Sequence, residues 1–512
     1  MSKIARSSLI VTVFTLLGLG LSFLSNVIIA ANFGAGMDMD VFLAATTLPF
    51  FITNILSGSL NFTFIPVFAE YREKEPSEIW KVVSSFINLN TLAALALCII
   101  GVILARPIMS AIAPGFSEDK LARSAELLRW LLPVIIFTAI NELLASVYYS
   151  TQRFIIPSLN KVISPVLTMA YVLAFHSSLS TKSIVLAMLT ASFVQASLLI
   201  IGFAKSGEFH YSFTLDHRHP GVIKIVKLMT PLVLGMLIYK AVPIVDAFFL
   251  SSLPGGSISH IGYAAKLTGS ILPIIVSGIS ISIFPAMSRY AAAKDLDALK
   301  EVLSKGVKML FFLGAPIVVL LGIYGRPIIQ LIFERRAFAS ADTTAVYYAF
   351  VFYLLALPAG AAGTLVSQAY YAIQENTLIA LISVALMLVY AGLCLFLIKP
   401  LGYLAIPAAY ALYYNCAILT TTLILRKKLS GAWPPMSRFF LKSSAAALAA
   451  AGLIYPLTHL AGDRAPVSAV FCATGFILYF IISKTILSLE EAGAIWTLFR
   501  EQLVSRYALW IR

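Results

Sequence analysis

Five ionisable side chains lie inside long apolar stretches and are the first candidates for chemistry: Glu142, Lys161, Lys240, Asp246 and Lys266. A charged side chain at the centre of a bilayer costs about 2.5–3.5 kcal/mol on insertion scales, so such residues usually face an aqueous cavity or pair with one another. Lys240 and Asp246 are six residues apart, which offsets them by about 120° around a helix and disfavours direct pairing. Lys266 is the better partner for Asp246, and a structural ion pair and a substrate or ion site both stay open.

Uncharged polar residues gather in the second apolar stretch, 41–69, which contains Thr53, Asn54 and Asn61. Polar or kinked segments occur at membrane depth only where other protein groups or the water of a cavity form hydrogen bonds with their polar groups. We expect these side chains to line a cavity, and close packing of small residues between helices is the alternative. The stretch 259–288 has the same character.

Asp40 follows a turn with two glycines, Phe33-Gly34-Ala35-Gly36, which joins the first two apolar stretches. Glycine permits the positive φ angles of a tight turn. The segment is either a plain connection between helices or a direct contact with a substrate.

The elements that must position these residues are membrane helices. Of the 512 residues, 60% are hydrophobic and only 12% are charged, about half the charged fraction of soluble proteins, which excludes a water-soluble globular enzyme. Stretches long enough to span a bilayer recur along the whole chain. We predict fourteen spans, at about 7–32, 41–69, 82–105, 126–151, 155–176, 183–204, 223–253, 259–288, 306–325, 343–373, 377–398, 401–425, 439–460 and 465–489.

The net charge of +14 fits a membrane protein with basic loops that face anionic lipid, and it gives no reason to expect nucleic acid. Most Lys and Arg residues fall in the two tails and in the connections on the same side as the tails. By the positive-inside rule, both termini are predicted to be cytoplasmic.

Short motifs recur about 220 residues apart and in the same order. The pairs are Ser57-Gly58 with Ser277-Gly278, Arg106-Pro107-Ile108 with Arg326-Pro327-Ile328, and Tyr148-Tyr149 plus Gln152 with Tyr370-Tyr371 plus Gln374. Six spans per repeat give two lobes of the same orientation, related by a pseudo-two-fold axis along the membrane normal. The predicted domains are 1–210 (first lobe), 215–428 (second lobe) and 429–512 (two further spans and a cytoplasmic tail).

This all-α architecture suits a transporter that works by alternating access, and a passive membrane scaffold is the alternative. The connections are short, so no extramembrane catalytic domain fits. We expect no catalytic residues, no bound metal and no cofactor, with a membrane potential or an ion gradient, of an ion left unidentified, as the source of energy.

The motifs, taken in order, resemble those of the MurJ/MviN family, the lipid II flippases of the MOP superfamily. The resemblance rests on Phe33-Gly34-Ala35-Gly36, Asp40-Val41-Phe42, Phe64-Ile65-Pro66-Val67-Phe68-Ala69-Glu70-Tyr71, Ala113-Pro114-Gly115-Phe116, Phe333-Glu334-Arg335, Ala337-Phe338 and Pro400-Leu401-Gly402. It implies a two-lobe transporter that moves an undecaprenyl-pyrophosphate-linked sugar precursor from the inner to the outer leaflet of the bacterial cytoplasmic membrane.

The chain departs from that family where arginines are expected in the cavity. The corresponding positions are Ser25 and Asn26 with their neighbours in the first span, Thr53 in the second, and Lys266 in the eighth; Arg336 stands where the family has glycine. Pyrophosphate carries at least two negative charges and is bound bidentately by arginine. Span 377–398 contains neither Asn nor Asp, which argues against a sodium site of the family type.

The predicted cavity residues are Lys266, Lys240, Asp246, Asp40, Thr53, Asn54, Asn61, Ser25 and Asn26. The predicted partners are an undecaprenyl-linked glycan and membrane lipids, and the protein is expected to be a monomer. An exporter of a lipid-linked oligosaccharide for exopolysaccharide or capsule, and a MATE-like drug or cation antiporter, are the alternatives. A major-facilitator carrier and a membrane glycosyltransferase are disfavoured, the first by its missing loop motif and the second by the lack of a large loop.

Overall fold

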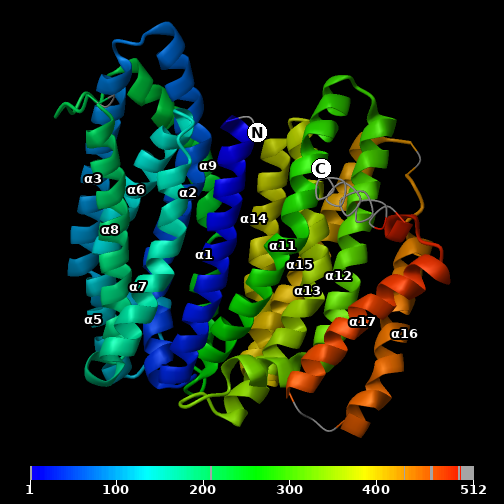
Figure 1. Cartoon of the computed structure of the whole chain (residues 1–512). Helices are drawn as coiled ribbons and strands as arrows, with labels where there is room; N and C mark the ends of the chain where they lie inside the picture. Colours follow the sequence, from blue (N-terminus) through cyan, green and yellow to red (C-terminus); the bar gives the residue numbers. More distant parts are fainter. Residues whose placement is uncertain (1–2, 208–209, 432, 462–464, 494–495, 497–512) are drawn as a thin grey trace, which may run out of the picture. The chain divides into compact units, whose positions relative to one another are not determined.

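The computed structural model describes residues 3–207, 210–431, 433–461, 465–493 and 496, and all regular secondary structure within them is helical (Figure 1). The chain forms two compact units. Unit 1 comprises Met1–Ser259 and Arg335–Ala339, and unit 2 comprises His260–Glu334 and Ser340–Arg512. The division predicted from the repeats, at 210 and 215, stays a prediction.

Unit 1 contains ten helices of the described chain: α1 (Lys3–Phe33), α2 (Met37–Lys74), α3 (Ile79–Ile103), α4 (Ala105–Ile112), α5 (Glu118–Leu131), α6 (Pro133–Ser150), α7 (Ile155–Leu179), α8 (Lys182–Ser206), α9 (Pro220–Tyr239) and α10 (Val242–Leu250). One buried apolar cluster of unit 1 joins α2, α3, α6, α8 and α9, with Phe64, Phe86 and Leu199 among its members. The side chains that α2 turns toward its neighbours are therefore fixed by packing.

Unit 2 contains most of α11 (Ser257–Ala292), and then α12 (Leu296–Phe333), α13 (Ser340–Ala372), α14 (Asn376–Leu401), a single 3-10 turn, α15 (Ala405–Leu429), α16 (Ser437–Ala461) and α17 (Ala465–Thr485). The last two helices pack on α12. The Tyr479 hydroxyl of α17 donates to the carbonyl of Phe312 at 2.9 Å and lies 2.8 Å from the Ser443 hydroxyl of α16.

The predicted membrane spans are confirmed within the described residues. Thirteen helical stretches there are long and apolar enough to cross a bilayer, and one of them, Thr377–Leu429, contains both α14 and α15. Counting these two helices separately gives the fourteen predicted spans. Two predicted spans are each made of two helices, because α5 continues into α6 and α9 into α10 with short breaks.

The internal repeat appears as one tyrosine contact in each unit. In unit 1 the Tyr148 hydroxyl of α6 donates to the carbonyl of Leu199 in α8 at 3.1 Å. In unit 2 the Tyr370 hydroxyl of α13 donates to the carbonyl of Thr421 in α15 at 2.8 Å. Both bonds link residues 51 positions apart and both side chains are at most 1% exposed. The repeated tyrosines therefore hold equivalent helix pairs together.

The repeated glutamines explain why the same motif ends each of these helices. Gln152 and Gln374 adopt left-handed φ angles of 59° and 62°. In both cases the amide of the following residue donates to the tyrosine carbonyl at 2.9 Å. This is the hydrogen-bond pattern of a Schellman motif, which satisfies carbonyls left open at a helix end.

Replacing either tyrosine by phenylalanine tests this equivalence. We expect Tyr148→Phe and Tyr370→Phe each to lower the free energy of unfolding in mixed micelles by about 1 kcal/mol, the net value of one buried hydrogen bond. The two losses should add, because the residues have no shared partner. Tyr348→Phe is the control, since its side chain is 52% exposed. Equal effects of all three changes would contradict the structural role of the pair.

Candidate functional site

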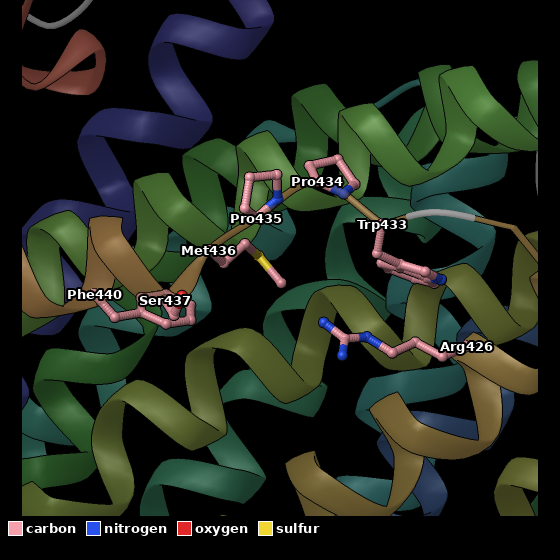
Figure 2. A pocket seen from close by; sticks show the side chains of 7 residues that line it. All are labelled: Arg426, Trp433, Pro434, Pro435, Met436, Ser437 and Phe440. Carbon is pink, nitrogen blue, oxygen red and sulfur yellow. The ribbon is translucent and has the colours of Figure 1, made fainter.

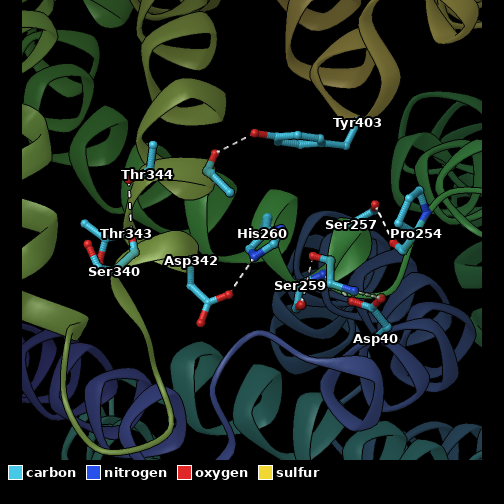
Figure 3. Close-up of polar contacts among 12 residues, drawn as sticks. Asp40, Pro254, Ser257, Ser259, His260, Ser340, Asp342, Thr343, Thr344 and Tyr403 are labelled. Carbon is cyan, nitrogen blue, oxygen red and sulfur yellow. Dashed lines mark hydrogen bonds and ion pairs between the residues drawn. The ribbon is translucent and has the colours of Figure 1, made fainter.

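Asp40, a predicted cavity residue, is buried and bonded to the backbone at the beginning of α11. Its side chain is 3% exposed, and its two oxygens accept hydrogen bonds from the amides of Gly256 at 2.6 Å and Ser259 at 2.7 Å. Figure 3 shows the carboxylate against this first turn. The first amides of a helix have no partner within the helix, and the helix dipole favours negative charge there. The observed role of Asp40 is thus that of a remote helix cap.

The segment 335–339 docks on the turn between α1 and α2 within unit 1. The amide of Ala337 donates to the carbonyl of Ala31 at 3.0 Å. Gly34 has φ +62°, and a Cβ there would lie 2.4 Å from the Ala337 carbonyl oxygen, so only glycine fits. Arg336 has φ +51° at the position where the family resemblance calls for glycine, and its guanidinium donates to the Asn32 side chain at 3.2 Å. That bond offsets part of the strain of the left-handed backbone.

The polar stretch of α2 keeps a helical backbone through its prolines. Thr53 and Asn54 each donate to the carbonyl of Phe50, at 3.2 and 2.7 Å, and Ser59 donates to the carbonyl of Ile55 at 2.8 Å. Hydroxyl and amide side chains can thus be accommodated in an apolar environment without breaking the helix. Asn61 lies in the same helix.

Thr53 and Asn54 line one pocket inside unit 1. Its volume is about 220 Å³, and its walls are α2, α6, α7 and α8. Polar residues from all four helices line it: Thr53, Asn54 and Ser57 of α2, Thr138 of α6, Ser164 of α7, and Ser192 and Gln195 of α8. The sequence predicted α2 as a wall but gave no sign of α6, α7 and α8, because their polar residues are scattered singly among apolar ones.

The seventh span is broken at Lys240. Helix α9 ends at Tyr239 and α10 begins at Val242, and Lys240 caps α9 with its amide bonded to the carbonyl of Met236 at 3.0 Å. Pro243 in the first turn of α10 lacks the amide that a continuous helix would need. The 120° offset expected between Lys240 and Asp246 assumed one continuous helix, and the structure has two helices here.

Lys266 lies in unit 2, whereas Lys240 and Asp246 lie in unit 1. Its ammonium is 5.7 Å from the ring centroid of Tyr263, one turn earlier on α11, and that ring is 1% exposed. This is the geometry of a cation–π contact. The predicted partnership of Lys266 with Asp246 stays a prediction.

The two predicted site residues of α1 differ in exposure. Ser25 is 6% exposed, whereas Asn26 is partly buried and donates to the carbonyl of Ser22 at 2.9 Å. Neighbouring helices fix α1 by a close approach, because a Cβ on Gly18 would lie 2.9 Å from the Cβ of Lys161 on α7. The role of spans one, seven and eight in a central cavity stays a prediction.

Unit 2 contains a polar pair whose contact the sequence did not predict. The His260 imidazole of α11 lies 3.0 Å from the Asp342 carboxylate of α13, and the Tyr403 hydroxyl donates to the carbonyl of Ala345 at 3.4 Å (Figure 3). His260 and Asp342 are distant in sequence, so no local motif predicts that they meet. They fix the first turns of α11 and α13 against each other.

A second pocket, of about 560 Å³, lies between the end of α15 and the start of α16 (Figure 2). The Arg426 guanidinium faces the Trp433 ring at 5.5 Å from its centroid. Lys428, two residues further along α15, forms an ion pair with Glu375. Both basic side chains are thus engaged within the protein.

The sequence matches a family model described as lipid II flippase MurJ over residues 29–474. The lipid II flippase MurJ of Burkholderia cenocepacia is 24% identical over 463 residues, which cover 88% of this chain and 89% of that protein. A probable lipid II flippase MurJ of Buchnera aphidicola subsp. Schizaphis graminum is 28% identical over 391 residues, 73% of this chain and 74% of that protein.

Solved structures agree on the fold. A lipid II flippase MurJ in an inward closed conformation matches with a TM-score of 0.79 and 22% identity, covering 93% of this chain and 98% of that one. An inward-facing MATE family multidrug transporter of the MOP superfamily matches with a TM-score of 0.70 and 14% identity, covering 80% and 94%. The predicted fold class, an all-helical membrane transporter of the MOP type, is confirmed.

Removing the Asp40 carboxylate tests its role as a helix cap. We expect Asp40→Ala to lower the free energy of unfolding by about 3 kcal/mol, because hydrogen bonds to a charged group contribute about 1.5–3 kcal/mol each. Asp40→Asn, which keeps one acceptor oxygen, should lose less. Asp38→Ala is the matched control, since Asp38 is 47% exposed in its ion pair with Arg123 and such pairs contribute little. Equal losses for Asp40→Ala and Asp38→Ala would refute the cap.

Proposed function

We propose a function from the premise that this chain belongs to the lipid II flippase MurJ family. The proposed function is to move an undecaprenyl-pyrophosphate-linked sugar precursor, lipid II or a close relative, from the inner to the outer leaflet. The observation that carries the proposal is the family match over residues 29–474. The fold supports it, because a TM-score of 0.79 to a MurJ structure extends over 93% of the chain.

The first argument for the substrate is the negative charge of its headgroup. The headgroup is linked through a pyrophosphate, so the site needs cations at membrane depth. Lys240 and Lys266 lie within spans, and the break beside Lys240 resembles the discontinuous helices that form substrate sites in transporters. Lysine offers a point charge without the guanidinium fork, so we expect weaker binding that tolerates more headgroup geometries.

Two alternatives differ in substrate. A related glycan for exopolysaccharide or capsule is favoured by the missing arginines at Thr53 and in α1. A MATE-like antiporter is suggested by fold alone, since the match is at 14% identity. We place lipid II first because the named relatives are lipid II flippases.

The setting proposed for this activity is the bacterial cytoplasmic membrane. We propose that both termini are cytoplasmic, that the protein works as a monomer without a catalytic centre, and that a membrane potential or an ion gradient drives it. The excess of Lys and Arg in the tails and in the connections on their side supports the orientation.

Reconstitution tests the function directly. Purified protein in liposomes with labelled lipid II in the inner leaflet should expose the label outside, and empty liposomes should not. In cells depleted of their own lipid II flippase, we expect weak rescue or none at normal expression, because the arginines expected in the first and second spans are missing. Flipping of another undecaprenyl-linked glycan but not of lipid II would assign the substrate to the alternative class.

Lys266 is the sharpest test of headgroup binding. We expect Lys266→Ala to reduce flipping about tenfold or more, since losing a charge-assisted contact costs about 1.5–3 kcal/mol and 1.4 kcal/mol is a factor of ten. Lys266→Arg should retain activity because it keeps the charge. Lys305→Ala is the control, as that lysine is 71% exposed and paired with Glu301. Full activity of Lys266→Ala in correctly inserted protein would rule out this role.

A further inference from the structure

Glu142 is a carboxylate inside the fourth span that headgroup binding does not use. It lies on α6 and is partly buried. The Ser57 hydroxyl of α2 donates a hydrogen bond to it. An ionised carboxylate with one hydroxyl donor, away from water, is costly at membrane depth. Such a group needs a counter-charge.

Protein cations near Glu142 are used elsewhere. On the helices packed against α6, the Lys161 ammonium of α7 donates to the Thr15 hydroxyl at 2.8 Å, and Lys182 at the start of α8 pairs with Glu126 at 2.6 Å. The remaining charged residues of α2, α3 and α8 lie toward helix ends: Asp38, Asp40, Glu70, Arg72, Glu73 and Lys74 on α2, Lys81 on α3, and Lys205 on α8. Those of α5 are spread along the helix that precedes α6: Glu118, Asp119, Lys120, Arg123 and Arg129. Tyr149, two turns along α6, is a titratable neighbour.

The polar pocket of unit 1 adjoins Glu142. Its partner Ser57 lines the pocket, and so does Thr138, which precedes Glu142 by four residues on the same helix face. The volume of about 220 Å³ accommodates several waters or a small ion with ligands. The carboxylate is thus next to space that an exchangeable ion can enter.

A buried oxygen on the next helix lacks a donor. The side-chain carbonyl of Asn160 on α7 has no hydrogen-bond partner among the described residues, although Asn160 is only 7% exposed. Its amide donates to the Asn141 side chain at 2.7 Å, and Gln195 donates to its backbone carbonyl at 2.9 Å. Ser164, one helical turn later on α7, lines the pocket. An unpaired buried acceptor is unusual in proteins and is explained by a missing donor or cation.

We propose that this pocket binds one exchangeable monovalent cation, a proton or Na⁺, at Glu142. Hard cations take oxygen ligands, and the Glu142 carboxylate, the Ser57 hydroxyl and the orphan Asn160 carbonyl are oxygens contributed by three helices. The cation neutralises the only acidic side chain in the middle of α6. If the proposed flippase function holds, exchange at this site couples an ion gradient to transport.

Infrared spectroscopy of the protein in liposomes, without any substrate, tests the binding. We expect a protonated-carboxyl stretch at neutral pH that is absent from Glu142→Gln and disappears at higher pH. If Na⁺ suppresses the band at constant pH, the site binds Na⁺. The same concentration of K⁺ is the ionic-strength control. If Na⁺ has no effect on the band, the site binds a proton. Asn160→Leu should weaken a sodium effect, and Glu126→Gln, on the exposed pair with Lys182, should leave the protonated-carboxyl stretch unchanged.

The outcome that overturns the proposal is a protonated-carboxyl region that is the same in Glu142→Gln as in the native protein at every pH and Na⁺ concentration. Size-exclusion profiles establish that the variants are folded. Flipping of lipid II under an imposed gradient of the assigned ion is the second measurement: the native protein should respond, whereas Glu142→Gln should flip at one rate regardless of the gradient. A native protein that flips neither lipid II nor another undecaprenyl-linked glycan refutes the proposed function and leaves the binding result to stand by itself.

Discussion

The hydrogen bonds accepted by one buried carboxylate determine where α11 can begin. Asp40 satisfies amides at Gly256 and Ser259, 216 and 219 positions further along the chain. These amides are buried in the protein, where no water can take them over, so the partner must come from the chain itself. The same requirement explains the back-bonded hydroxyls of α2 and the tyrosine contacts to carbonyls of α8 and α15. Satisfying polar groups without solvent is the constraint common to these features.

Much of the fold was predictable because lipid imposes a simple rule on sequence. An uninterrupted apolar stretch of sufficient length must be a helix, and the spans predicted for 155–176 and 183–204 agree with α7 and α8 to within a few residues. The internal repeat was also detectable in the sequence, since Tyr148 and Tyr370 form equivalent hydrogen bonds in the two units. Hydropathy could not place the break at Lys240, because both flanking segments are apolar.

The candidate site was less predictable, because its residues acquire their roles from distant partners. Asp40 looked like a turn residue or a substrate ligand until its amide partners were known. Thr53 was expected in a pocket, but the walls contributed by α6, α7 and α8 depend on tertiary packing that leaves no local pattern. Arg336 at a left-handed position could be seen only as a departure from the family, and the structure adds the Asn32 contact that accompanies it.

The short segment Arg335–Ala339 gives the chain a particular order of assembly. It belongs to unit 1, yet it is synthesised only after α11 and α12. Domains usually fold as units during synthesis, the N-terminal one first. Here the ribosome must pass residue 339 before the loop that docks beside Ala31 and Gly34 is available. Unit 1 is therefore incomplete until α11 and α12 have been synthesised, and a nascent chain that ends before residue 335 would present the turn at Gly34 to the insertion and quality-control machinery without its docking segment.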